Sequence, residues 1–301
     1  MQIPKLAVII PCYNEELCIE KTCRRLLEVL EMLVEKGKIS SDSYIYCVDD
    51  GSNDSTWSII ERLHSETPLV KGATFVRNYG NQKALIAGLE GVRDLGCDCA
   101  VSIDADLQQD ELSIEQFVDE YQKGYDIVLG VRNDRKTDNF FKKITAIMFY
   151  KLMNILGSKI AMNHSDYRLV SKKALDMMDL YHEKSLFLRG FFHELGLKTT
   201  TVKFNVKPRF AGQSKFNFIS LMGLALNGIT SFSIVPLRII YGLGFIMALF
   251  GFLMGLETIL EKIFFNDSPN GVATMIILLC FFGGLQIFCL GVIGEYVGQV
   301  Y

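Results

Sequence analysis

The stretch VSIDADLQQDE, residues 101–111, decides which fold the chain can adopt. Residues 101–103 are small or apolar, as in a buried strand, and two carboxylates, Asp104 and Asp106, follow directly. Two carboxylates at alternate positions of a turn can present their oxygens to one hard cation such as Mg²⁺ or Mn²⁺. The stretch therefore predicts a buried strand that ends at a cation site, although acidic turn residues are also common without any such role.

Similar strands lie on both sides of this stretch and alternate with helical segments. Apolar runs at 5–10, 44–48, 71–76, 99–103 and 126–131 are separated by segments with helical spacing at 19–34, 55–64, 82–95 and 113–122. This β-α alternation predicts a largely parallel sheet with helices on both faces. The chain of 301 residues has room for one such α/β domain and something smaller.

Charge and cysteine content narrow the class of protein. The formal net charge is −3, so the chain lacks the basic excess of a nucleic-acid binder. The eight cysteines form no CxxC pair and no zinc spacing, which indicates reduced and mostly buried thiols in a domain that faces the cytosol. The N-terminal residues are typical of a first strand rather than of a signal peptide.

The last quarter of the chain is strongly apolar. Residues 239–256 and 268–294 carry no charge, and each run is long enough to cross a bilayer as a helix. We expect spans at about 236–258 and 271–295, with two buried core helices as the alternative. Basic residues precede the first run and acidic residues dominate the loop between the runs, which predicts a multi-pass protein of the cell membrane with its N-terminal domain in the cytoplasm.

Polar clusters follow four of the expected strands, where ligands bind in parallel sheets. They are PCYNEE at 11–16, DDGSNDST at 49–56, RNYGNQ at 77–82 and DADLQQD at 104–110. Asp49 and Asp50 could accept hydrogen bonds from a base or a ribose. The chain contains no GxxxxGK[ST] loop and no GxGxxG after its first strand, which excludes a P-loop enzyme and weakens a dinucleotide-binding interpretation.

These clusters, in this order, resemble the family 2 glycosyltransferases with a nucleotide-sugar-binding (GT-A) fold. With DYRLVSKKAL at 166–175, RFAGQSKFN at 209–217 and the two apolar runs, the resemblance narrows to the polyisoprenyl-phosphate branch, which includes dolichol-phosphate mannose synthase and the bactoprenol glucosyltransferases. It implies a cytosolic catalytic domain at 1–214, interfacial amphipathic helices at 215–234 and a membrane hairpin at 235–301. A homo-oligomer is left open.

The resemblance also implies a reaction. A single hexose would pass, with inversion, from a nucleotide diphosphate sugar to a polyprenyl phosphate, with UDP favoured as the nucleotide and undecaprenyl phosphate as the lipid. Three sets of residues carry over: nucleotide-sugar ligands Pro11, Tyr13, Asn14, Glu16, Asp49, Asp50 and Asp104; metal ligands Asp104, Asp106 and Gln108 for Mg²⁺ or Mn²⁺; and acceptor-phosphate ligands Arg132, Arg135, Arg168, Arg209, Ser214 and Lys215.

Asp166, together with Asp106, is the implied catalytic residue. In the family, the matching carboxylate is regarded as the catalytic base. A phosphate monoester with a second pKa near 6 is, however, already largely dianionic at neutral pH and needs little deprotonation. Asp166 could instead orient Arg168 or the acceptor.

Three other functions are alternatives to this one. A processive polysaccharide synthase would need a QxxRW-type motif, and the single tryptophan is Trp57, early in an expected helix. A metal-dependent nucleotidyltransferase does not explain RFAGQSK beside two apolar runs. A non-catalytic membrane scaffold predicts degraded acidic motifs, and these are intact.

Overall fold

The computed structural model describes residues 3–133, 164–181, 188, 191, 192, 195–207 and 271–300, with isolated positions between 240 and 264. The described residues through Lys207 belong to one compact unit, and those from Ile240 onward belong to a second. Each unit is described by itself. The interfacial helices expected at 215–234, and most of the span expected at 236–258, lie outside the described residues.

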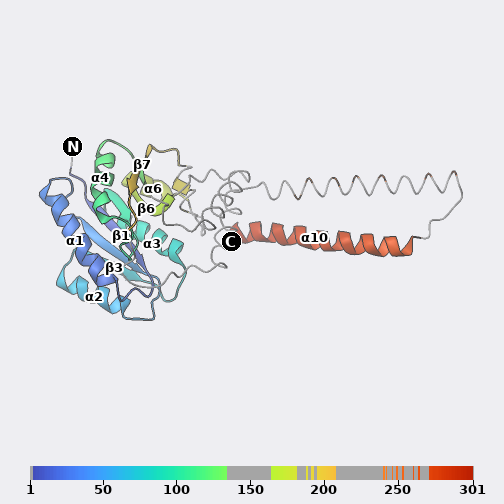
Figure 1. Ribbon diagram of the computed structural model, residues 1–301, viewed down its shortest axis with the longest axis horizontal. Helices are drawn as coiled ribbons and strands as arrows, with labels where there is room; N and C mark the ends of the chain where they lie inside the picture. Colours follow the sequence, from blue (N-terminus) through green and yellow to red (C-terminus); the bar gives the residue numbers. More distant parts are fainter. Residues whose placement is uncertain are drawn as a thin grey trace. The chain divides into compact units, whose positions relative to one another are not determined.

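The described residues of the first unit form one sheet of seven strands (Figure 1). Its order is β3-β2-β1-β4-β6-β5-β7. All neighbouring strands are parallel except that β6 runs antiparallel to both β4 and β5. The strands are β1 (Leu6–Cys12), β2 (Tyr44–Asp49), β3 (Val70–Thr74), β4 (Cys99–Ser102), β5 (Ile127–Arg132), β6 (His164–Ser171) and β7 (Thr199–Phe204).

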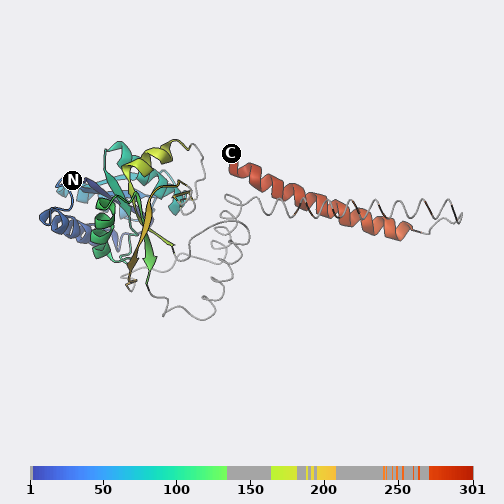
Figure 2. The ribbon, with the colours of Figure 1, turned by 90° about the horizontal axis from the view of Figure 1, so that it is seen from above.

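Helices cover both faces of the sheet (Figure 2). Successive side chains of β1 point to opposite faces of the sheet. Val8 and Ile10 pack with α1, α2 and α4, whereas Ala7 and Ile9 pack with α3 and α6. A strand buried on both faces must be apolar throughout, which explains the unbroken run at 6–10. The α-helices among the described residues of this unit are α1 (Ile19–Glu35), α2 (Thr56–Glu66), α3 (Asn81–Asp94), α4 (Ile114–Gln122) and α6 (Lys172–Asp179).

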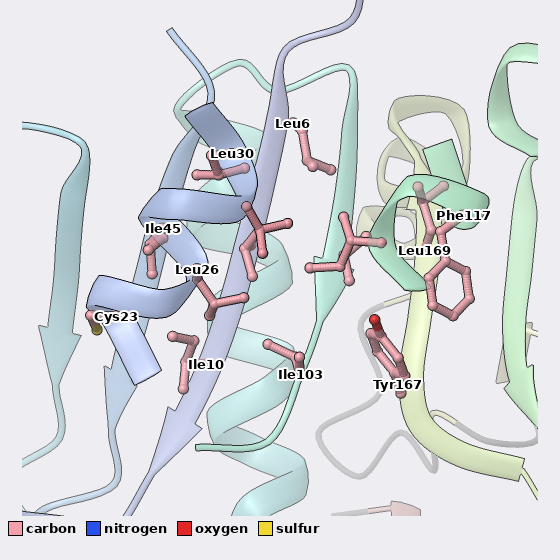
Figure 3. Close-up of a cluster of buried hydrophobic side chains, with 14 of the residues drawn as sticks. Leu6, Ile10, Cys23, Leu26, Leu30, Ile45, Ile103, Phe117, Tyr167 and Leu169 are labelled. Carbon is pink, nitrogen blue, oxygen red and sulfur yellow. The ribbon is translucent and has the colours of Figure 1, made fainter. Parts of the chain in front are cut away.

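The core on the α1 face joins distant parts of the chain (Figure 3). Leu26 and Leu30 of α1 pack over β1 and β2, and Phe117 of α4 packs edge-on against Tyr167 of β6 with ring centroids 4.6 Å apart. Each large apolar side chain that is fully buried contributes roughly 1.5–3 kcal/mol. This packing fixes the positions of the strand ends from which the polar loops start.

The prediction of a mostly parallel α/β sheet is confirmed, and every expected strand from 5 to 131 is present within a few residues. Strands β6 and β7 were not expected from the sequence. In the second unit, α10 (Val272–Val300) is a long helix, and Leu279, Phe288 and Leu290 are among its exposed side chains. Within the described part of the chain, no helix is both long and apolar enough to cross a membrane. The domain boundaries remain predictions.

Candidate active site

The fold gathers the predicted polar clusters at one edge of the sheet. The carboxyl ends of β1, β2, β3 and β4 lie at this edge because these strands are parallel neighbours. Since β6 is antiparallel, its beginning lies there too, and Arg168 sits opposite Ser102. Asp166 therefore comes to the same edge as the acidic loop that follows β4.

The loop after β1 is bound to the loop after β2. The side-chain carbonyl of Asn14 accepts from the backbone N–H of Asn53 at 2.9 Å, and the carboxylate of Glu16 accepts from the N–H of Ser55 at 3.0 Å. The backbone N–H of Asn14 in turn donates to the hydroxyl of Ser52 at 2.8 Å. Two of the predicted nucleotide ligands, Asn14 and Glu16, thus hold the two loops together; Pro11 is buried in β1 and Tyr13 is half-buried beside them.

Asp49, at the end of β2, is 1% exposed and organises its own surroundings. Its carboxylate accepts from the Ser52 hydroxyl and from the Thr74 hydroxyl, the latter at 2.7 Å. These bonds join the ends of β2 and β3. A contact of Asp49 with a nucleotide stays a prediction.

Asp50 is 2% exposed and binds the loop after β3. Its two carboxylate oxygens accept from the backbone N–H groups of Tyr79 and Gly80, at 2.7 and 2.8 Å. Gly51 has φ +68, and a Cβ there would lie 2.4 Å from the backbone carbon of Arg77. Only glycine fits this crossing of two loops, which accounts for the glycine in DDGS.

The acidic loop after β4 is supported from inside and from α1. The backbone N–H of Asp104 donates to the side-chain carbonyl of Gln109 at 2.9 Å, and the amide nitrogen of Gln109 donates to Oδ2 of Asp104 at 2.7 Å. The hydroxyl of Thr22, in α1, donates to the carbonyl of Ala105 at 2.6 Å. The direction of Asp104 is therefore set by the protein itself.

Asp106 and Gln108 form a short turn in the same loop. Oδ1 of Asp106 accepts from the backbone N–H of Gln108 at 3.1 Å, and Leu107 between them has φ +54, a left-handed conformation. The predicted metal ligands Asp104, Asp106 and Gln108 supply carboxylate and amide oxygens, the donors that Mg²⁺ and Mn²⁺ prefer. Among the described residues, no group of three or more His, Cys, Asp or Glu could hold a metal ion, and the metal site stays a prediction.

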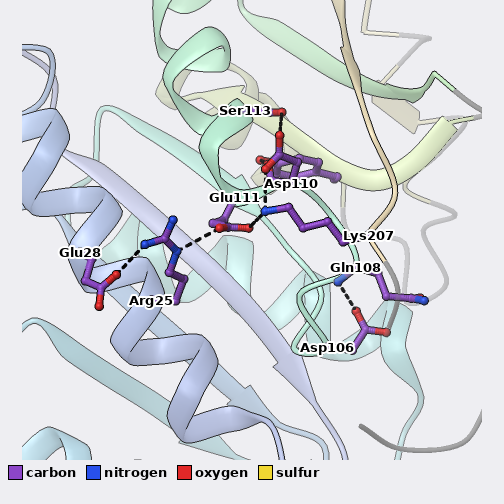
Figure 4. A network of polar contacts seen from close by, with 9 residues as sticks. Arg25, Glu28, Asp106, Gln108, Asp110, Glu111, Ser113 and Lys207 are labelled. Carbon is purple, nitrogen blue, oxygen red and sulfur yellow. Dashed lines mark hydrogen bonds and ion pairs between the residues drawn. The ribbon is translucent and has the colours of Figure 1, made fainter. Parts of the chain in front are cut away.

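The segment after β7 is bound to the acidic loop (Figure 4). The backbone N–H of Lys207 donates to the carbonyl of Gln108 at 2.8 Å, and its Nζ lies 2.9 Å from Asp110 and 2.7 Å from Glu111. Arg25 of α1 reaches Glu111 from the other side at 3.0 Å. Burial alone would raise the pKa of Glu111, but hydrogen bonds from Lys207 and Arg25 outweigh it and the pKa is lowered.

Asp166 and Arg168 form a nearly buried ion pair on β6. The guanidinium of Arg168 lies 2.8 Å from Oδ1 of Asp166 and donates to the carbonyl of Leu188 at 3.0 Å. Arg168 is 3% exposed, so a contact with the acceptor phosphate stays a prediction. Of the other predicted phosphate ligands, Arg132 is exposed at the end of β5, and Arg135, Arg209, Ser214 and Lys215 lie outside the described residues.

Four residues of this edge were not found from the sequence: Thr22, Arg25, Gln109 and Lys207. Thr22 and Arg25 are one helical turn apart on α1, a spacing that places both side chains on the same face. Gln109 follows the predicted ligand Gln108 and carried no separate signal. Each of these residues is recognised as part of the site only from the contact with the acidic loop that the fold produces.

Comparisons with known proteins identify the class and then the family. The mostly parallel sheet covered by helices is a GT-A-like α/β fold, and the family model "Glycosyl transferase family 2" matches residues 7–178. The chain belongs to glycosyltransferase family 2. A second model, "GtrB C-terminal hairpin", matches residues 235–300.

Several relatives match almost the entire chain. An uncharacterized glycosyltransferase of Bacillus subtilis (strain 168) is 42% identical, over 99% of this chain and 88% of its own length. The prophage bactoprenol glucosyl transferase homolog of Escherichia coli (strain K12) and the bactoprenol glucosyl transferase of Shigella phage SfX are each 38% identical, over 99% of this chain and 94% and 95% of their lengths. Glucosyl-3-phosphoglycerate synthase from Mycobacterium tuberculosis, solved with Mn²⁺, uridine diphosphate and glucosyl-3-phosphoglycerate, is 18% identical with a TM-score of 0.47, over 75% of this chain and 76% of that chain.

Proposed function

We propose that the protein transfers a single glucose, with inversion, from UDP-glucose to a polyprenyl phosphate such as undecaprenyl phosphate. The observation that carries this proposal is the 38% identity with bactoprenol glucosyl transferases over 99% of the chain. The similarity includes both the residues that match the glycosyltransferase model and those that match the C-terminal hairpin model, which supports a lipid acceptor as well as sugar transfer.

The polar loops supply what this reaction requires. The anomeric carbon develops positive charge while the departing diphosphate develops negative charge, which a bound divalent cation neutralises. Asp104, Asp106 and Gln108 would hold that cation, and the loops fixed by Asp49 and Asp50 would enclose the nucleotide. Asp166 and Arg168 would face the acceptor from the start of β6.

The site would lie at the cytosolic face of the cell membrane. Two uncharged runs, 239–256 and 268–294, support a membrane hairpin, and six Lys or Arg residues with no acid between Leu195 and Leu256 support a cytosolic position for the residues before it. This arrangement would bring the RFAGQSK segment close to the lipid phosphate.

The test is transfer of radiolabelled glucose to lipid. Purified full-length protein in detergent is incubated with labelled UDP-glucose, undecaprenyl phosphate and Mg²⁺ or Mn²⁺, and the organic-extractable label is counted. We expect one labelled product, a glucosyl phosphate lipid that releases glucose on mild acid treatment. Asp106→Asn, which removes one charge of the metal site, should reduce transfer by at least a hundredfold while far-UV circular dichroism stays unchanged.

Each other outcome has a defined meaning. Transfer of a different labelled sugar, with UDP-glucose inert, would retain the reaction class and replace the donor. Label in a long polymer would indicate a processive synthase, and transfer of the nucleotide part would indicate a nucleotidyltransferase. Near-normal transfer by Asp106→Asn, or transfer unaffected by chelation, would exclude the proposed metal site.

A further inference from the structure

Gln109 makes two hydrogen bonds to one residue, Asp104, and the function proposed above gives neither bond a role. Its carbonyl oxygen accepts from the backbone N–H of Asp104 at 2.9 Å, and its amide nitrogen donates to Oδ2 of Asp104 at 2.7 Å. Gln109 is 2% exposed, and its backbone forms a bridge with Val206 beyond β7. The amide is thus held in the protein and faces the first carboxylate of the acidic loop.

This pairing restrains the Asp104 carboxylate. A carboxylate turns easily about its last side-chain bond, but a planar amide that contacts both the backbone and one carboxylate oxygen restricts that rotation. An acceptor alone would have satisfied the backbone N–H. The donor half of the amide acts on the carboxylate, and as a neutral donor it leaves the negative charge of Asp104 available to a cation.

Two neighbouring glutamines therefore have different surroundings. Gln108 is half-buried and follows Leu107, whose left-handed backbone changes the direction of the chain, whereas Gln109 is buried behind Asp104. Partners that hold the ligands of a metal, without contacting the metal, commonly change its affinity by 10- to 100-fold when removed.

We propose that Gln109 is a positioning residue for a divalent cation carried with a nucleotide diphosphate: it sets the direction in which Asp104 presents its carboxylate. This inference rests on the proposed function, because it assumes that Asp104 is a metal ligand. It assigns Gln109 no contact with substrate or metal.

The test measures Mn²⁺ binding directly. Free Mn²⁺ is followed by electron paramagnetic resonance while full-length protein in detergent is titrated, once with Mn²⁺ alone and once with UDP present. The variants are Gln109→Met, which removes both hydrogen bonds, and Gln109→Asn, which keeps an amide one methylene too short to make both. Gln122→Met is the matched control, because Gln122 also donates to a protein carbonyl, that of Lys38 at 3.0 Å, at the end of α4.

We expect both Gln109 variants to weaken Mn²⁺ binding by 10- to 100-fold and to change the spectrum of bound Mn²⁺, while Gln122→Met binds as the wild type does. Wild-type affinity in a folded Gln109 variant would overturn the inference. Loss of folding in both Gln109 variants would also overturn it, since Gln109 would then be required by the loop itself. Asp104→Asn separates the two proposals: if it binds Mn²⁺ normally, the metal site of the proposed function fails, whatever Gln109 does.

Discussion

The guanidinium of Arg168 lies 2.8 Å from Oδ1 of Asp166, with both side chains on the same strand and almost withdrawn from solvent. Arg168 also donates to the carbonyl of Leu188 and lies over the ring of Phe192, 5.4 Å from its centroid. The carboxylate is thus held by a cation that is itself held in place. This arrangement favours an orienting role for Asp166 over that of a base.

We predict that Asp166→Asn and Arg168→Lys lower kcat by similar factors, each below about a hundredfold, with little change in either KM. Lysine lacks the planar fork that matches a carboxylate, so it should disturb the pair about as much as the loss of charge does. The measurement is steady-state kinetics with donor and acceptor varied separately. A loss of about 10²- to 10⁴-fold in Asp166→Asn alone, with Arg168→Lys near the wild type, would identify Asp166 as a base.

Lys207 is expected to stabilise the acidic loop through Glu111. Lys207→Met leaves the nearly buried carboxylate of Glu111 with Arg25 as its remaining cation among the described residues, and we expect a loss of about 1–3 kcal/mol in the free energy of unfolding of the first unit. Because Lys207 is partly exposed, the full cost of breaking a buried pair is not expected. Chemical denaturation measures it, and Lys203→Met, an exposed position on the same part of the chain, should change stability little.

The same pair predicts a dependence on pH. The pKa of Glu111 is lowered in the folded protein, so its contribution to stability is present above the ordinary glutamate pKa of about 4.3 and is lost as the pH falls through the lowered value. Glu111→Gln should therefore flatten the stability profile below about pH 4.3. Thermal unfolding between pH 3 and pH 7 would test this. If stability fell equally steeply with falling pH in the wild type and the variant, other carboxylates would account for the loss of stability in acid.

The buried cysteines are expected to be inert. The Sγ atoms of Cys23 and Cys47 lie 3.7 Å apart, and both residues are fully buried. Burial also raises the pKa of Cys97 to about 12. Only the thiolate reacts with alkylating agents. Iodoacetamide at pH 8 should therefore leave these thiols unmodified in the folded protein and modify them in guanidinium, as mass spectrometry would record. Rapid labelling of Cys23 or Cys47 in the native state would contradict the packing.

Topology can be tested by introduced cysteines. Asn266→Cys, between the two apolar runs, should react with a membrane-impermeant maleimide in intact cells, whereas Lys215→Cys should react only after lysis. Label at both positions in intact cells, or at neither after lysis, would refute the proposed orientation.

The fold was predictable where the signal is local. The apolar runs of β1, β2 and β4 are buried on both faces, and this burial produces the continuous pattern that the sequence displays. The strand β6 carries polar residues in its first half, Asp166 and Arg168, which pair with each other although they are almost buried. Its pattern therefore did not resemble that of a strand, and its antiparallel direction depends on pairing with distant β4 and β5.

The acidic residues of the candidate site could be predicted from the sequence, whereas the residues that hold them in place could not. Asp49 ends β2 and Asp50, Asp104 and Asp106 come after strands, and parallel topology brings all four to one edge. Gln109 and Lys207 act through geometry that arises only in three dimensions, because one is buried behind the acidic loop and the other comes from beyond β7. No spacing in the sequence relates Lys207 to Glu111.

The order of the strands has a consequence for how the chain matures on the ribosome. Strand β5 joins the described sheet between β6 and β7, and β6 is the strand that pairs with β4 beyond β1. When β5 has been synthesised, the open side of β4 still has no strand to pair with, because β6 has yet to emerge. The nascent chain therefore carries a half-built sheet with an unpaired edge at β4 until β6 has emerged, and during this interval that edge is open to pairing with another chain.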